Sequence, residues 1–165
     1  MKLRPARHVD AWRIVELLVA KQADSIYAGR VAVDEPMARK LVSSLVQRHG
    51  ASNDGASCVF VIEDDTETVC AFIVGALSRV YLIGDKLVAQ DMFLVADKAA
   101  PATAYSKLID AYVGWAESCP SVVEINLSWT DVAGAGEAMS AAYERKGFTR
   151  CGAIFRRDMA EGQGQ

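Results

Sequence analysis

Three β-rich runs follow one another in the middle of this 165-residue chain, and they restrict its fold more than any other feature. They read SCVFVIEDD (57–65), TVCAFIVGALSRVYLI (68–83) and KLVAQDMFLVAD (86–97). The turn-forming residues DDTE divide the first run from the second, and GD divides the second from the third. Because connections this short join antiparallel neighbours, the sequence predicts a three-stranded antiparallel meander.

The first third of the chain is helical after one short strand over residues 2–7. Residues 8–25 form an amphipathic pattern with Asp10 near its start, and residues 34–50 begin with acidic residues and Pro36 and end at a glycine. The apolar stripe predicted for the first helix consists of Trp12, Val15, Leu18 and Val19.

After the meander, helices and strands alternate. We expect a helix over residues 103–117, a strand over 122–128, a helix over 134–147 and a final strand or hairpin over 148–159. The strand–helix–strand unit should be parallel and right-handed. The chain is therefore predicted to be one α+β domain, residues 1–160, with a mixed, mostly antiparallel sheet, helices on both faces, and a flexible tail over residues 161–165.

Composition excludes several classes of protein. The formal charge of −3 argues against nucleic-acid binding through net basic charge. The first residues contain no apolar run long enough for a signal peptide or a membrane span, so we expect a cytoplasmic protein without a membrane partner. Four cysteines without a CxxC pair and two histidines predict no metal site, and the cysteines are expected to be reduced and buried.

The last helix ends in YERKGF, residues 143–148. Gly147 is the usual left-handed stop and the two basic residues complement the helix dipole, but neither explains Tyr143. This ending, together with the order of elements, resembles the GNAT superfamily of acyl-CoA N-acyltransferases, whose members typically carry Tyr–x–x–x–Gly–Phe there. The resemblance implies that the Tyr143 hydroxyl donates a proton to the thiolate of coenzyme A as the acyl group leaves. A tyrosine packed against the sheet is the structural alternative.

The resemblance also implies acetyl-CoA as co-substrate. Backbone groups of the third meander strand, at Phe93, Leu94 and Val95, would pair with its pantetheine arm. Its pyrophosphate would lie at the following loop and helix start, where the family has a basic residue and glycines.

This chain departs from that loop pattern. If Leu108 and Ile109 match the family's paired aliphatic residues, the basic position falls on Ala100 and the glycine positions on Pro101, Thr103 and Tyr105. Lys98 could replace the lost cation. The small residues Ala102, Thr103 and Ala104 keep the helix start lightly covered, and the Thr103 hydroxyl could cap the helix or contact phosphate.

Two further sites follow from the resemblance. Family members often place a general base on the third meander strand, and Asp91 is the residue we expect there, with Glu124 on the next strand as second choice. The family shapes its acceptor pocket between the first two helices, where Tyr27 and Arg30 could bind the substrate and Arg30 would favour an acidic group. A solvent-facing carboxylate and a solvated loop are the structural alternatives.

Two functions remain open. The first is transfer of an acetyl group from acetyl-CoA to a primary amine, whether a small molecule, a protein N-terminus or a lysine. The second is a degenerate GNAT-fold protein that binds or assembles without catalysis, which the altered loop favours.

The divergent loop, combined with the conventional GF ending, also resembles small GNAT-like proteins of phages. That resemblance would suit either an enzyme that modifies a host protein or a virion component. Three or more free backbone N–H groups of KAAPAT (98–103) that face a cleft between the third meander strand and strand 122–128 would favour cofactor binding. A cleft filled by Pro101 and side chains would argue against it. The resemblance also implies a homodimer through sheet edges or the C-terminal strand, because single-domain GNAT-like proteins often associate.

Overall fold

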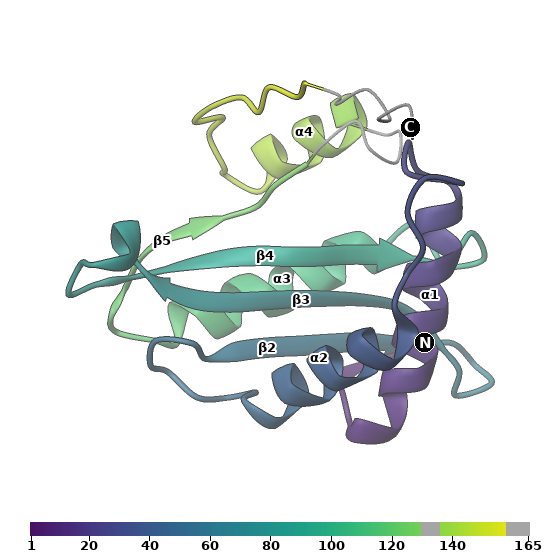
Figure 1. Ribbon diagram of the computed structural model, residues 1–165. Helices are drawn as coiled ribbons and strands as arrows, with labels where there is room; N and C mark the ends of the chain where they lie inside the picture. Colours follow the sequence, from purple (N-terminus) through teal and green to yellow (C-terminus); the bar gives the residue numbers. More distant parts are fainter. Residues whose placement is uncertain (130–135, 158–165) are drawn as a thin grey trace, which may run out of the picture.

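The computed structural model describes residues 1–129 and 136–157 of the chain (Figure 1). Its strands are β1 (Lys2–Pro5), β2 (Ser57–Glu63), β3 (Val69–Arg79), β4 (Leu87–Ala96) and β5 (Val122–Asn126). Its α-helices are α1 (Ala11–Ala23), α2 (Glu35–Gln47), α3 (Ala104–Glu117) and α4 (Gly136–Arg145), with short 3-10 turns η1 (His8–Asp10) and η2 (Val80–Leu82).

The five strands form one sheet in the order β1-β2-β3-β4-β5. The first three pairings are antiparallel and β4–β5 is parallel. The predicted meander and the predicted mixed, mostly antiparallel sheet are therefore confirmed. The crossover from β4 to β5 runs through α3, as expected for a parallel pair.

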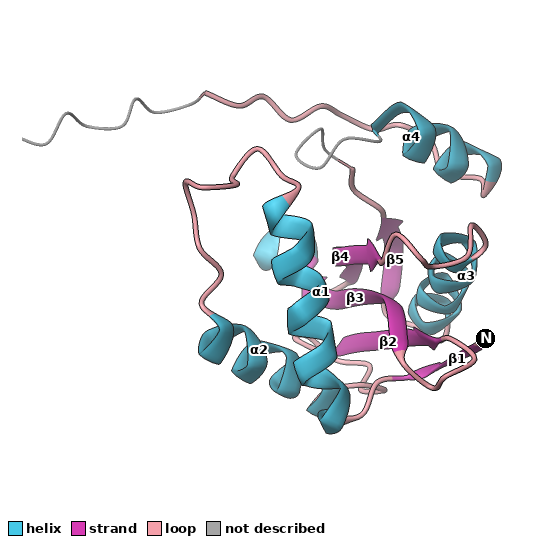
Figure 2. Ribbon diagram, turned by 90° about the vertical axis from the view of Figure 1, so that its right-hand side faces the viewer, coloured by secondary structure: helices cyan, strands magenta, loops and turns pink. Residues whose placement is uncertain are grey.

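Helices cover both faces of the sheet, as the sequence predicts (Figure 2). α1 and α2 bury Ile14, Val15 and Leu45 against one face, and α3 buries Leu108 and Tyr112 against the other. The strands between these two layers read as nearly continuous apolar runs because both of their faces are covered.

The helix starts and apolar stripes follow the sequence with one exception. The Asp34 side chain caps α2 by accepting a hydrogen bond from the Met37 N–H at 2.9 Å. Trp12, predicted to lie on the buried stripe of α1, is instead 64% exposed. The Arg39 guanidinium lies 4.0 Å from its ring centroid, so Trp12 packs under a cation from α2 and not in the core.

The predicted final strand is wrong over the residues that the structure describes. Residues 148–157 contain no strand, and none of the described strands pairs with them. A β-forming sequence becomes a strand only where another strand satisfies its backbone groups, and this segment runs away from the sheet. Residues 158 and 159 of that prediction, and the tail 161–165, lie outside the described residues.

Candidate functional site

The parallel strands β4 and β5 separate partway along their length. Their pairing runs from Leu87↔Val122 to Gln90↔Asn126 and then stops. Beyond this point residues 91–96 of β4 continue along β3, and no described strand pairs with their other edge. This edge, which includes Phe93, therefore offers free backbone groups to an extended ligand.

A β-bulge marks the point of separation. Gly75 of β3 lies opposite Asp91 and its neighbour Val74 opposite Phe93, so that Met92 is skipped. The extra residue reverses which side chains face α3: Ala89 does so before the bulge and Leu94 after it. The predicted cofactor residues are thus split, with Leu94 facing α3 and Phe93 and Val95 facing α1 and α2.

A single residue, Ser128, which follows β5, holds Asp91 in place. Its Oδ1 accepts hydrogen bonds from the Ser128 N–H at 2.7 Å and from the Ser128 hydroxyl at 2.9 Å. Burial raises the pKa of Asp91 above its usual value, and the two hydrogen bonds from Ser128 offset part of that rise. A carboxylate with a raised pKa is a better proton acceptor than an exposed one, so Asp91 has the chemistry of a general base.

Tyr143 reaches the same residue from α4. It is 6% exposed, and its hydroxyl donates a hydrogen bond to the Ser128 carbonyl oxygen at 3.2 Å. Burial raises the pKa of Tyr143, and the negative charge of Asp91 raises it further. The structure therefore brings the predicted acid and the predicted base together around Ser128.

The YERKGF ending of α4 is a Schellman motif. Gly147 has φ 88°, its N–H donates to the Glu144 carbonyl at 3.0 Å, and the Phe148 N–H donates to the Tyr143 carbonyl at 3.1 Å. The ring centroids of Tyr143 and Phe148 lie 6.3 Å apart, which is the apolar contact that accompanies this motif. Glycine and phenylalanine thus fix the end of α4 and, with it, the position of the tyrosine.

The start of α3 presents free donors despite its departure from the family's glycines. The Ala104 N–H donates to the Pro101 carbonyl at 2.8 Å. Among the described residues, nothing accepts from the backbone N–H groups of Ala102, Thr103, Tyr105 and Ser106. Thr103 occupies the N-cap position, but its hydroxyl makes no capping hydrogen bond. This helix start therefore keeps more than three donors for an anion.

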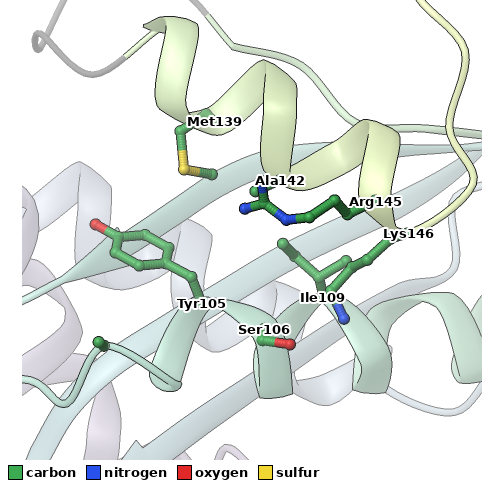
Figure 3. A pocket seen from close by; sticks show the side chains of 8 residues that line it. Tyr105, Ser106, Ile109, Met139, Ala142, Arg145 and Lys146 are labelled. Atoms are coloured by element: carbon green, nitrogen blue, oxygen red, sulfur yellow. The ribbon is translucent and has the colours of Figure 1, made fainter.

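A pocket of about 290 Å³ lies beside these donors, between α3 and α4 rather than between β4 and β5 (Figure 3). Its lining includes Ala102, Tyr105 and Ser106 from the start of α3, and Arg145 and Lys146 from the end of α4. The Arg145 guanidinium extends into the pocket.

The two basic residues of this pocket are held differently. Arg145 makes no ion pair with any residue that the structure describes, whereas Lys146 is paired with Asp110 of α3. Lys98, the expected substitute for the family's basic residue, is 90% exposed and is paired with Asp24 at 3.3 Å, away from this pocket. The cations next to the free N–H groups therefore come from α4 and not from the loop.

Tyr105, at one of the family's glycine positions, lies between this pocket and β4. Burial raises the pKa of Tyr105, and the nearby backbone N–H of Ala96, at the end of β4, opposes that rise. The Tyr105 hydroxyl therefore lies close to the far end of the open edge of β4.

The remaining predicted residues lie elsewhere. Glu124 is exposed on β5 and takes no part in the Asp91–Ser128–Tyr143 arrangement. Tyr27 and Arg30 lie in the exposed connection between α1 and α2. The Lys98–Asp24 ion pair joins the start of this connection to the loop after β4.

Sequence reasoning missed Ser128 and Arg145. A polar residue just after a strand is too common to single out Ser128. Arg145 belongs to the YERKGF ending of α4, where its position in the sequence indicates only a complement to the helix dipole. One signal could have indicated Arg145: the loop lacks the family's basic residue, so a cation that binds phosphate has to come from another element.

Residues 1–129 and 136–157 contain no group of three or more potential metal-ligating side chains. No helix in that part of the chain combines the length and the apolar character that crossing a membrane requires.

Known proteins resemble this chain in structure and not in sequence. No protein-family model matches it, and no curated protein matches it. An acetyltransferase from Trypanosoma brucei superimposes with a TM-score of 0.67 at 16% identity, over 96% of this chain and 99% of that one. Glucosamine-6-phosphate N-acetyltransferase from Arabidopsis thaliana gives 0.66 at 14% identity, over 97% and 98%.

A possible acetyltransferase from Clostridium difficile gives a TM-score of 0.66 at 14% identity, over 97% of both chains. Identities this low show the fold alone. Since these matches extend over nearly the whole of each chain, this protein has the fold of the GNAT acetyltransferases.

Proposed function

We propose that this protein transfers an acetyl group from acetyl-CoA to a primary amine. The observation that carries the proposal is the joint fixation of Asp91 and Tyr143 by Ser128, at the point where β4 and β5 separate. A half-buried carboxylate and a buried phenol beside an open strand edge are the acid–base pair that aminolysis of a thioester needs.

The residues present fit the co-substrate. The open edge of β4 at residues 93–95 can pair with the amide groups of the pantetheine arm. The free N–H groups of Ala102, Thr103 and Ser106 can bind phosphate, and Arg145 and Lys146 add positive charge beside them. Ala104 has no such role, because its N–H is already bonded.

Each side chain then has one task. When bound, acetyl-CoA supplies an activated acyl carbon and a thiolate leaving group. Asp91 accepts a proton from the attacking amine, directly or through water, and burial keeps its carboxylate basic enough to do so. A phenol is protonated at neutral pH and the raised pKa of Tyr143 keeps it so at higher pH, so Tyr143 can donate its proton to the departing sulfur. Tyr27 and Arg30 are proposed to contact the acceptor.

Calorimetric titration of acetyl-CoA into the purified protein tests the proposal. We expect micromolar binding, and Arg145→Gln should weaken it about tenfold, the usual loss for one charge-assisted phosphate contact. Lys98→Gln is the matched control, because it also removes one basic charge but is paired with Asp24 outside the pocket.

The two variants also test which basic residue binds the phosphate: Lys98, as expected from the sequence, or Arg145, which lines the pocket. Weaker binding in Lys98→Gln with unchanged binding in Arg145→Gln would contradict the assignment to α4. No binding at millimolar acetyl-CoA would contradict the transferase proposal itself and support a fold kept without its cofactor.

A further inference from the structure

The Ser128 hydroxyl has the surroundings of an activated nucleophile. It donates to Asp91 Oδ1 at 2.9 Å, and the Ser128 N–H donates to the same oxygen at 2.7 Å. A hydroxyl that directs its proton at a carboxylate within hydrogen-bond reach is the arrangement in which a general base activates a serine. The proposed base of the site therefore already faces a hydroxyl when no amine is bound.

This hydrogen bond distinguishes Ser128 from the other serines whose hydroxyl bonds the structure describes. The hydroxyls of Ser25, Ser57 and Ser118 all donate to backbone carbonyl oxygens. A carbonyl oxygen orients a hydroxyl but does not take its proton, whereas a carboxylate can do both. Burial raises the pKa of Asp91, which makes its carboxylate a stronger base toward this hydroxyl.

Ser128 is also accessible, and the proposed acid is bonded to it. The residue is exposed, and it lies just beyond the point where β4 and β5 separate. Because the hydroxyl proton is directed at Asp91, the lone pairs of its oxygen remain for another atom. The Tyr143 hydroxyl donates to the Ser128 carbonyl oxygen at 3.2 Å. A base, a nucleophile and an acid are thus held together by one residue.

We propose that Ser128 is a self-acetylation site whose hydroxyl takes the acetyl group of acetyl-CoA when no amine occupies the site. The Ser128 oxygen forms a bond to the acyl carbon as the bond between that carbon and sulfur breaks. The hydroxyl proton passes to Asp91, and Tyr143 gives its proton to the leaving sulfur. Asp91 then returns its proton to the Tyr143 phenolate through water, so the products are an acetyl ester on Ser128 and a free thiol. This inference rests on the function proposed above, because it uses the same donor, acid and base.

Mass spectrometry of the intact protein after incubation with acetyl-CoA and no acceptor tests the proposal. The chain should carry Cys151→Ser, since Cys151 is exposed and the other three cysteines are buried. We expect one added acetyl group, located at Ser128 by peptide fragmentation. Hydroxylamine should remove it, because this reagent cleaves an acetyl ester and leaves an acetylated lysine intact. Asp91→Asn keeps an acceptor for the hydroxyl but cannot take its proton, so the adduct should form about 100-fold more slowly.

Two serine variants decide whether the adduct depends on this hydroxyl. Ser128→Ala should lose the adduct. Ser118→Ala is the matched control, because Ser118 is also exposed but its hydroxyl donates to the Trp115 carbonyl, and it should keep the adduct. A hydroxylamine-sensitive adduct that persists in Ser128→Ala would overturn the proposal.

A second donor separates this inference from the function on which it rests. p-Nitrophenyl acetate carries an activated acetyl group without coenzyme A, so its reaction needs no cofactor site. Release of nitrophenolate should show a burst of about one equivalent per chain, which Ser128→Ala abolishes. Binding of acetyl-CoA without an adduct from either donor would overturn self-acetylation and leave the transferase proposal standing. A burst from Ser128 without binding of acetyl-CoA would support the nucleophile and contradict the transferase proposal.

Discussion

The Tyr143 hydroxyl donates its hydrogen bond to the carbonyl oxygen of Ser128, 3.2 Å away. The N–H and hydroxyl of the same serine both donate to Asp91. Ser128, which follows β5, therefore fixes both Tyr143 of α4 and Asp91 of β4. This arrangement requires β4 and β5 to separate after Gln90, because Ser128 could not reach Asp91 in this way along a continuous ladder.

Replacing Tyr143 with phenylalanine should lower kcat about 100-fold, the lower range for loss of a general acid, while leaving the affinity for acetyl-CoA unchanged. The ring stays in place, because phenylalanine preserves the contact with Phe148 that closes α4. Steady-state kinetics with calorimetry measures both quantities. Tyr81→Phe is the control, since this tyrosine is 90% exposed in η2 and its hydroxyl has no assigned role. Equal activity of Tyr143→Phe and the unmodified chain would contradict the role of Tyr143 as acid.

The pH profile of kcat/KM should report Asp91. A base must be deprotonated, so the rate should fall as pH drops through the raised pKa of Asp91. Ser128→Ala removes the hydroxyl that stabilises the carboxylate but keeps the backbone N–H, so the acid limb of the profile should shift to higher pH. An acid limb that Ser128→Ala leaves in place would show that another group controls it.

Substitution by the neutral amide distinguishes the two candidate bases, Asp91 and Glu124. Asp91→Asn should abolish this acid limb and lower the rate about 100-fold. Glu124→Gln should change neither, because Glu124 is exposed on β5 and outside the arrangement around Ser128. If Glu124→Gln were the slower variant, the second choice from the sequence would be the base.

Local patterns were sufficient to predict most of the fold. The meander follows from three β-rich runs divided by short turns, and α3 and β5 follow from a helix-forming and a strand-forming pattern. Trp12 and the final strand were predicted wrongly for a common reason. An apolar residue or a β-forming segment can be buried or form a strand only if a partner elsewhere in the chain allows it. Trp12 packs against Arg39 instead of the core, and no described strand pairs with residues 148–157.

The candidate site could be predicted only in part for a similar reason. Asp91 and Tyr143 each stand out in the sequence by residue type and position. Ser128 acts through its backbone N–H and carbonyl as well as its hydroxyl, and those groups carry no sequence signal. Arg145 could be connected with the start of α3 only once the packing of α4 was known.

Gly75 should be intolerant of a side chain. A Cβ at this position of β3 would lie 2.7 Å from Cδ2 of Tyr112 and 3.2 Å from Sγ of Cys58. Tyr112 is fully buried and its hydroxyl donates to the Asn126 carbonyl at 2.9 Å, so the ring has no room to move aside. Gly75→Ala should therefore lower the free energy of unfolding by about 2 kcal/mol, as overpacking of a core does.

Gly114→Ala is the matched control for this substitution. Gly114 lies inside α3, and nothing is within 4 Å of a Cβ built there. Gly114→Ala should stabilise the protein by about 0.5–1 kcal/mol, because alanine loses less backbone entropy than glycine when the helix forms. Urea unfolding measures both variants, and equal effects of the two would contradict the packing argument for Gly75.

A buried ion cluster beside β1 should make the free energy of unfolding fall at low pH. The Arg4 guanidinium donates to both carboxylate oxygens of Asp10, at 2.7 and 2.9 Å, and to Glu63. These bonds lower the pKa of Glu63. Burial opposes the shift at Asp10, but Arg4 and the Arg7 N–H outweigh it and lower its pKa as well. Both carboxyls thus stabilise the fold above their ordinary pKa values of 3.8 and 4.5, and this stability is lost as pH falls through the lowered folded values.

Arg4→Met should remove this contribution at neutral pH. It leaves two carboxylates without their main partner, and breaking a buried pair in this way should cost about 3 kcal/mol of unfolding free energy. The deficit should shrink at about pH 3, where protonation removes the unpaired charges. Lys98→Gln, which breaks the exposed pair with Asp24, should cost less than about 0.5 kcal/mol at either pH. A deficit in Arg4→Met that stayed constant between the two pH values would show that lost packing of the Arg4 side chain, and not unpaired charge, causes it.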